Sequence, residues 1–155
     1  MIVKDQREAL CVACEMERRA IAIYERALTL TGSEEVKAGI RQILEDEREH
    51  LRRFSEMKTR HCVEYGEEER LLISAMGAEA LFPGGVMEMR RSHALSSLEG
   101  LYTFARDSEA DAVRTYGHFA DQCADEEVRQ AFQTIAREEG THLSALEDRL
   151  TDMRP

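Results

Sequence analysis

The sequence has no tryptophan, only two prolines and few aromatic residues, which make up 6% of the chain. Proline interrupts helices, and strands are usually rich in β-branched and aromatic residues. This chain is instead dominated by glutamate, arginine, alanine and leucine, which favour helix. The composition therefore predicts an all-α protein.

Long hydrophobic runs are also missing, since no stretch approaches the roughly 18 apolar residues that a membrane span needs. The first ten residues, MIVKDQREAL, are charged by residue 4 and lack the apolar core of a secretion signal. We expect a soluble cytoplasmic protein without a membrane partner. Its four cysteines are then expected to be reduced thiols.

Basic residues are outnumbered, with 21 Lys and Arg against 31 Asp and Glu, for a formal net charge of −10. An acidic chain repels phosphates, so no nucleic-acid partner is expected. Acidic composition is common among soluble proteins, and it is also compatible with attracting cations. At 155 residues and 43% hydrophobic composition, the chain is predicted to form a single domain, 1–155, with a real core.

The spacing of apolar residues predicts four long helices. We expect the first to be ended by Gly32, the second to be capped by Ser33 and the fourth to be capped by Asp125. The predicted ranges are about 3–30, 33–60, 92–123 and 125–151. Only short loops separate the first two helices and the last two, which predicts two antiparallel helix hairpins.

A different kind of segment, about 61–91, lies between the two predicted hairpins. It contains EEERLLISAM, a candidate short helix, followed by the helix breaker FPGG. This length is ample to cross a helical bundle from end to end. The expected fold is a four-helix bundle of two hairpins and one long crossover.

The two predicted hairpins repeat one pattern of functional residue types. A Glu-x-x-His motif occurs twice, and the second copy lies 92 positions after the first. The same offset relates a glutamate and a tyrosine of the first helix to those of the third. The related pairs are Glu17 with Glu109, Tyr24 with Tyr116, Glu47 with Glu139, and His50 with His142. A shared offset without gaps indicates an internal duplication.

All four repeated glutamates fall within the apolar stripe of their helix, whereas others, such as Glu45 and Glu49, fall outside it. Carboxylates buried together repel one another and cost several kcal/mol each. Two divalent cations would balance four carboxylates, and the two imidazoles would add neutral ligands. Oxygen ligands with one imidazole per ion suit iron or manganese better than a structural zinc.

The ligand pattern resembles the ferritin-like superfamily, and within it the rubrerythrins, over about residues 5–150. The resemblance implies a ferritin-like bundle with two iron ions per chain, manganese or zinc being possible, and a homodimer. It implies bridging roles for Glu47 and Glu139 and terminal roles for Glu17 and Glu109, while His50 and His142 each complete one metal. Tyr24 and Tyr116 would hydrogen-bond ligand carboxylates.

Two departures from the rubrerythrin pattern weaken a peroxidase assignment. Rubrerythrins usually carry a further carboxylate three residues after the third-helix glutamate, where this chain has Ala112. We also expect no rubredoxin domain, because no double Cys-x-x-Cys module follows the fourth helix. Neither departure alters the six predicted ligands.

Cys11 and Cys14 form a lone Cys-x-x-Cys pair, with Cys14 one turn before Glu17 on the same stripe. They could be a redox dithiol that supplies electrons, or simply small core residues, which we favour.

Three functions follow from the predicted ligand set. The first is a di-iron oxidoreductase that reduces hydrogen peroxide or O2 with electrons from an external donor protein. The second is an iron-handling protein that oxidises Fe(II) for storage or detoxification. The third is a non-catalytic bundle in which metal only holds the helices together, as an interaction or sensor module.

Overall fold

The computed structural model describes residues 3–61, 65–81 and 97–153, and this part of the chain is helical without a strand. The prediction of an all-α protein is confirmed. The helices are α1 (Gln6–Leu28), α2 (Glu34–Arg60), α3 (Glu67–Leu81), α5 (Leu98–Gln122) and α6 (Glu126–Asp152). None of the described helices is long and apolar enough to cross a membrane.

Short polar side chains begin the four long helices. Ser33 accepts a hydrogen bond from the backbone N–H of Val36, and Asp125 accepts one from Val128. Both predicted caps are therefore confirmed. Asp5 and Ser97 cap α1 and α5 in the same way. Each cap satisfies a backbone donor that has no partner within its helix.

The end of α1 differs from the prediction, because the helix stops at Leu28 and Gly32 lies in the loop beyond it. The backbone N–H of Thr29 turns back to the carbonyl of Arg26, and the Thr29 hydroxyl donates to the same carbonyl. The last carbonyl groups are thus satisfied by a tight turn rather than by a glycine cap.

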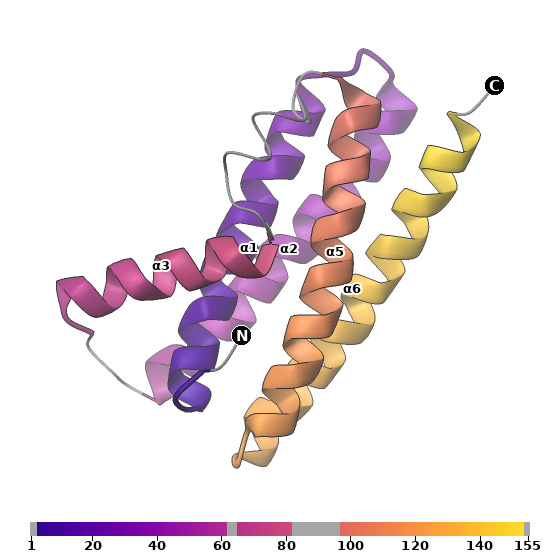
Figure 1. Cartoon of the computed structure of the whole chain (residues 1–155). Coiled ribbons are helices and arrows are strands. Elements are labelled where there is room, and N and C mark those ends of the chain that lie inside the picture. Colours follow the sequence, from indigo (N-terminus) through magenta and orange to yellow (C-terminus); the bar gives the residue numbers. More distant parts are fainter. Residues whose placement is uncertain (1–2, 62–64, 82–96, 154–155) are drawn as a thin grey trace.

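The four long helices run side by side, and α3 crosses them (Figure 1). The closest pairings are α1 with α2 and α5 with α6, while α3 packs on α1 and α5. Part of the core is a cluster of aromatic rings from α2, α5 and α6, in which contacting rings have centroids 5.0 to 5.9 Å apart: Phe54, Tyr116, Phe119 and Phe132. This packing fixes α2, α5 and α6 against one another beside the polar residues described below.

The predicted crossover is described only in part. The candidate short helix EEERLLISAM is confirmed as the greater part of α3. The breaker FPGG and the predicted start of the third long helix near residue 92 lie outside the described residues.

Gly77 lies at a close approach of α3 to α1. A Cβ atom added at this position would lie 2.7 Å from the Cβ of Glu15, closer than real Cβ atoms approach. Gly77→Ala should therefore lower the free energy of unfolding by about 1–3 kcal/mol, because α3 must move away from α1. Thermal and chemical denaturation measure this change.

Gly117 is the matched control, since it is also helical and an added Cβ would meet nothing within 4 Å. Gly117→Ala should raise the free energy of unfolding by up to about 1 kcal/mol through helix propensity alone. Equal effects of the two substitutions would contradict the close contact between α3 and α1.

Candidate metal centre

Six ionisable side chains meet inside the bundle, and the long helices supply all of them. Each is at most 4% exposed to solvent. They are the six residues predicted as ligands: Glu17 on α1, Glu47 and His50 on α2, Glu109 on α5, and Glu139 and His142 on α6. The structure therefore brings together every residue of the predicted ligand set.

The six residues form two overlapping groups, each suited to hold a metal ion. Within each group, one ligand atom per residue lies within 4.8 Å of the others. The first group is Glu17, Glu47, His50 and Glu139, and the second is Glu47, Glu109, Glu139 and His142. Glu47 and Glu139 belong to both groups, whereas each of the other four residues belongs to one.

Both histidines direct Nδ1 toward the carboxylates. His50 Nδ1 lies 3.2 Å from Glu139 and 3.8 Å from Glu17. His142 Nδ1 lies 2.9 Å from Glu139, 3.1 Å from Glu47 and 3.8 Å from Glu109. The two imidazole rings stack with their centroids 5.8 Å apart. Each ring can thus offer Nδ1 to one of the two groups.

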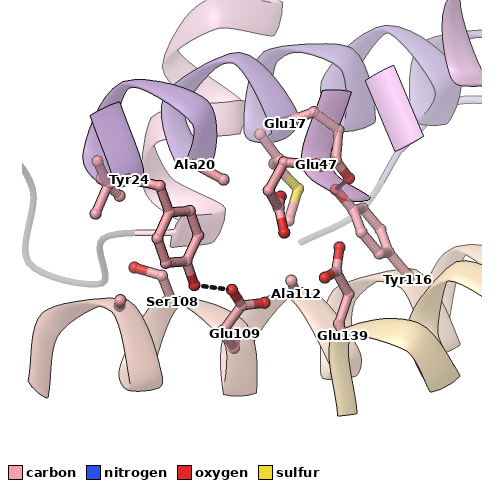
Figure 2. A pocket seen from close by; sticks show the side chains of 12 residues that line it. Glu17, Ala20, Tyr24, Glu47, Ser108, Glu109, Ala112, Tyr116 and Glu139 are labelled. Carbon is pink, nitrogen blue, oxygen red and sulfur yellow. Dashed lines mark hydrogen bonds between the residues drawn. The ribbon is translucent and has the colours of Figure 1, made fainter. Parts of the chain in front are cut away.

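The tyrosine hydroxyls donate hydrogen bonds across the bundle. Tyr24 on α1 donates to Glu109 on α5 (Figure 2), and Tyr116 on α5 donates to Glu17 on α1. Burial, followed by the charge of the neighbouring glutamate, raises the pKa of both phenols well above its ordinary value. Both phenols therefore stay protonated and act as donors. The predicted hydrogen bonds from tyrosine to the repeated glutamates are confirmed.

The buried carboxylates destabilise one another's charge. Burial is the largest cause that raises the pKa of Glu17, Glu47 and Glu139 well above the ordinary value. Neighbouring carboxylates add to this shift, Glu47 for Glu17 and Glu139 for Glu47. A nearby positive charge would act in the opposite direction and lower the pKa of these carboxylates.

The two histidines respond to different surroundings. Burial lowers the pKa of His50. Burial also acts to lower the pKa of His142, but the nearby carboxylates of Glu109, Glu139 and Glu47 outweigh it and the pKa is raised. A proton on His142 therefore partly balances the carboxylates.

Two buried polar atoms at the centre have no hydrogen-bond partner in the described part of the chain. They are Oε1 of Glu47 and Nδ1 of His50. Such atoms are rare in protein cores, because an unmade hydrogen bond costs about 1–3 kcal/mol. Both are atoms of types that ligate metals, and their residues, Glu47 and His50, belong to one group. The donor set thus fits a cation chemically and leaves these atoms free to bind it.

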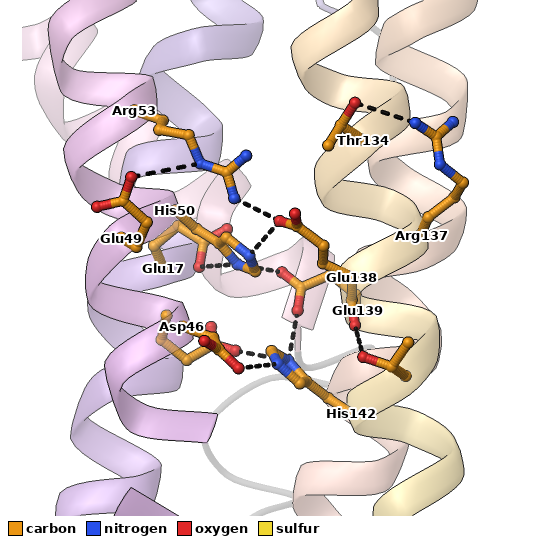
Figure 3. A network of polar contacts seen from close by, with 12 residues as sticks. Glu17, Asp46, Glu49, His50, Arg53, Thr134, Arg137, Glu138, Glu139 and His142 are labelled. Atoms are coloured by element: carbon orange, nitrogen blue, oxygen red, sulfur yellow. Dashed lines mark hydrogen bonds and ion pairs between the residues drawn. The ribbon is translucent and has the colours of Figure 1, made fainter. Parts of the chain in front are cut away.

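A second layer of charge lies outside the histidines, on the side of α2 and α6 (Figure 3). His50 Nε2 lies 2.9 Å from Glu138, and His142 Nε2 lies 3.3 Å from Asp46. Arg53 donates a hydrogen bond to Glu138. A carboxylate that holds the outer nitrogen of a histidine fixes the ring with its other nitrogen facing inward.

Our sequence prediction did not include Asp46 and Glu138, although a signal was present. Glu138 lies 92 positions after Asp46, so the two belong to the same repeat as the ligands. Each carboxylate reaches the histidine of the other helix, as the tyrosines also do across the bundle.

A small cavity of about 10 Å³ lies on the opposite side of the carboxylates, between α1 and α5 (Figure 2). Apart from the four glutamates, both tyrosines and Ser108, its lining is apolar: Met16, Ala20, Ile23, Ala105 and Ala112. Ala20 and Ala112 are themselves related by the 92-residue offset. This volume is close to the lower limit for one water molecule.

A larger polar pocket of about 260 Å³ lies on the histidine side. It is lined by Asp46, Glu49, His50, Arg53, Glu138, Thr141 and His142. The centre therefore has one polar side, toward α2 and α6, and one largely apolar side, toward α1 and α5.

Cys11 and Cys14 are buried as free thiols. Burial raises the pKa of both, and the Sγ atom of Cys14 lies 3.8 Å from the Ser55 hydroxyl. A buried thiol with a raised pKa is a weak nucleophile. These features agree with core packing, and neither cysteine belongs to the two groups of candidate ligands. Cys123 is also a buried free thiol, whereas Cys62 lies outside the described residues.

Comparisons with known proteins identify no relative, since no protein-family model, curated protein or solved structure matches this chain.

The raised carboxylate pKa values predict how the metal-free protein responds to pH. A group with a raised pKa in the folded state contributes stability below its unfolded pKa, and this stability is lost as the pH rises through the folded pKa. Glu17, Glu47 and Glu139 share this direction, and so does His142. His50 acts in the opposite direction, because its lowered pKa favours the neutral ring.

We therefore expect the metal-free protein to lose stability as the pH rises above about 5, as measured by urea denaturation. Glu47→Gln should reduce this loss and raise the stability of the metal-free protein near neutral pH. Glu45→Gln, at a position outside both groups, should leave the pH profile unchanged. A flat profile for the unmodified protein would contradict the electrostatic description.

Proposed function

We propose that the chain is a non-haem di-iron oxidoreductase of the rubrerythrin-like kind, which reduces hydrogen peroxide or O2 at a carboxylate-bridged metal pair. The observation that carries this proposal is the overlap of the two groups. Glu47 and Glu139 are common to both, while each group has its own histidine and its own further glutamate. This is the arrangement that two neighbouring cations with shared carboxylates require.

Charge supports the same proposal. Four glutamates at no more than 4% exposure are unfavourable unless positive charge accompanies them. Two divalent cations balance four carboxylates, and the unpartnered atoms of Glu47 and His50 give them ligands. Carboxylate oxygens with one imidazole per ion favour iron or manganese.

When bound, an iron pair supplies two electrons to a peroxide or to O2. The protein's own residues hold and shield that centre. Hydrogen bonds from Tyr24 and Tyr116 fix Glu109 and Glu17, so that one oxygen of each carboxylate is restrained.

The cavity between α1 and α5 supports a very small substrate. It borders all four glutamates and is otherwise lined mainly by apolar side chains. A space of this size and polarity suits O2 or hydrogen peroxide and excludes a larger organic substrate. The electrons must come from an external donor protein, because the buried thiols of Cys11 and Cys14 resist ionisation.

A second candidate function is oxidation of Fe(II) as a substrate, for iron storage or detoxification. The polar pocket on the α2 and α6 side favours it, since the pocket places Asp46, Glu49 and Glu138 beside both histidines. Carboxylates beside a buried centre can attract and transfer cations.

One experiment separates these functions. The protein is purified without chelator, its metal content is measured, and it is then loaded anaerobically with Fe(II) and mixed rapidly with peroxide or O2. About two irons per chain, oxidised faster by peroxide than by O2, support the peroxidase function. Faster oxidation by O2 with continued consumption of Fe(II) supports iron handling. Bound iron without turnover supports a non-catalytic bundle, and absence of metal binding contradicts all three.

Glu47→Gln should abolish binding of the metal pair, because it removes charge from a residue common to both groups. We expect the loss of both ions together with the loss of metal-dependent stabilisation in thermal unfolding. Glu45→Gln should retain both ions. Retention of two ions by Glu47→Gln would contradict the shared position of this residue.

Ala112→Leu tests the cavity between α1 and α5, since the longer side chain would fill it. We expect two ions to remain bound and the reaction with O2 or peroxide to slow at least about tenfold, as measured by stopped-flow absorption. Ala75→Leu is the control, at an exposed position of α3. An unchanged rate in Ala112→Leu would show that the substrate reaches the centre elsewhere.

A further inference from the structure

The inner residues of the centre are duplicated, so they alone would build two equivalent metal positions. Each group takes one histidine and one unshared glutamate, related by the 92-residue offset, and both share the same two glutamates. Any difference between the positions must therefore arise from how these residues sit or from what surrounds them.

The two repeats differ in the outer layer of charged residues. Asp46 and Glu138 are repeat partners, and each contacts the outer nitrogen of one histidine. Arg53, however, has Ala145 as its repeat partner. Arg53 pairs with Glu138 (Figure 3), whereas no lysine or arginine in the described part of the chain forms an ion pair with Asp46. Arg53 also lies 3.9 Å from Glu49, but Glu49 is held more closely by Arg52.

The negative charge around the inner nitrogen, Nδ1, is also greater for His142 than for His50. His142 Nδ1 has three carboxylates between 2.9 and 3.8 Å away. His50 Nδ1 has two, and the nearer one lies 3.2 Å away. Both the inner and the outer surroundings of His142 are therefore more negative. The outer contact of His142 is the longer one, 3.3 Å against 2.9 Å, but no arginine or lysine of the described residues pairs with Asp46 there.

We propose that Arg53 makes the two metal positions unequal, so that the position of His142 binds its cation first and the position of His50 binds its cation more weakly. Arg53 is a positioning residue that acts through Glu138. The Nε2–H of His50 donates to Glu138, and this hydrogen bond makes Nδ1 a stronger ligand in proportion to the negative charge on Glu138. The guanidinium of Arg53 takes up part of that charge. This inference rests on the proposed metal centre, but not on its reaction.

The size of the effect follows from general experience with outer residues of metal sites, whose substitution changes metal affinity by about 10- to 100-fold. We therefore expect the two binding constants of the unmodified protein to differ by at least about tenfold. A smaller difference would be hard to separate from the statistical difference between two equal positions.

The test is an anaerobic titration of the metal-free full chain with Co²⁺. Binding is measured during the titration by calorimetry and by visible absorption. The unmodified protein should bind two ions in two resolved steps. Arg53→Gln should strengthen the second step by about tenfold and bring the two steps together. Arg53→Lys retains the positive charge and should bind two ions in two resolved steps, as the unmodified protein does.

Arg52→Gln is the matched control, since Arg52 is the adjacent arginine and pairs with Glu49 and Glu56 rather than with Glu138. It should leave both steps unchanged. His142→Ala should lose the stronger step and keep the weaker one, while His50→Ala should do the reverse. Circular dichroism of each variant establishes that the helices form.

Two equal binding steps in the unmodified protein would overturn this inference, and so would an unchanged second step in Arg53→Gln. Either result would leave the proposed metal centre standing. If no Co²⁺ is bound by the unmodified protein, both the inference and the metal centre are wrong. Failure to react with peroxide or O2 would affect only the proposed reaction, because this titration contains neither.

Discussion

Mutual repulsion among four buried carboxylates is the constraint on which the structure depends. Glu17, Glu47, Glu109 and Glu139 occupy core positions that leucine or isoleucine would fill at far lower cost. The surroundings of the cluster reduce that cost. Tyrosine hydroxyls donate to two of the carboxylates, and a proton on His142 can face three. Two buried polar atoms of the cluster still lack a hydrogen-bond partner in the described residues, and the cluster has the residues that could hold a metal ion.

The two sides of the centre differ in polarity. Toward α2 and α6 lie the histidines, the outer carboxylates and a polar pocket. Toward α1 and α5 lie alanine, isoleucine and methionine side chains around a much smaller cavity. The centre therefore presents a polar surface on one side and a largely apolar surface on the other. The helices that supply the histidines also supply the outer charge, because one turn of α2 or α6 carries both.

The sequence was most informative where residue type conflicts with position. A glutamate in an apolar stripe is costly, so its repetition at a fixed offset located all six candidate ligands and both tyrosines. The same reasoning did not identify Asp46 and Glu138. Each directly precedes a repeated glutamate and is about 40% exposed, and an exposed acidic residue needs no explanation. The predicted end of α1 was wrong, because a turn at Thr29 ends the helix before Gly32 is reached. Apolar periodicity does not reveal the hydrogen bonds of such a turn.

The crossed contacts have a consequence for how such a centre could have arisen. Tyr24 serves the glutamate of α5 and Tyr116 that of α1, while Asp46 and Glu138 exchange histidines in the same manner. Half of the chain, with one copy of each residue type, therefore cannot complete the network. Two identical half-length chains related by a twofold axis would complete it. This chain keeps the twofold relation in its inner residues, whereas Arg53 lies on one side only, with Ala145 as its repeat partner.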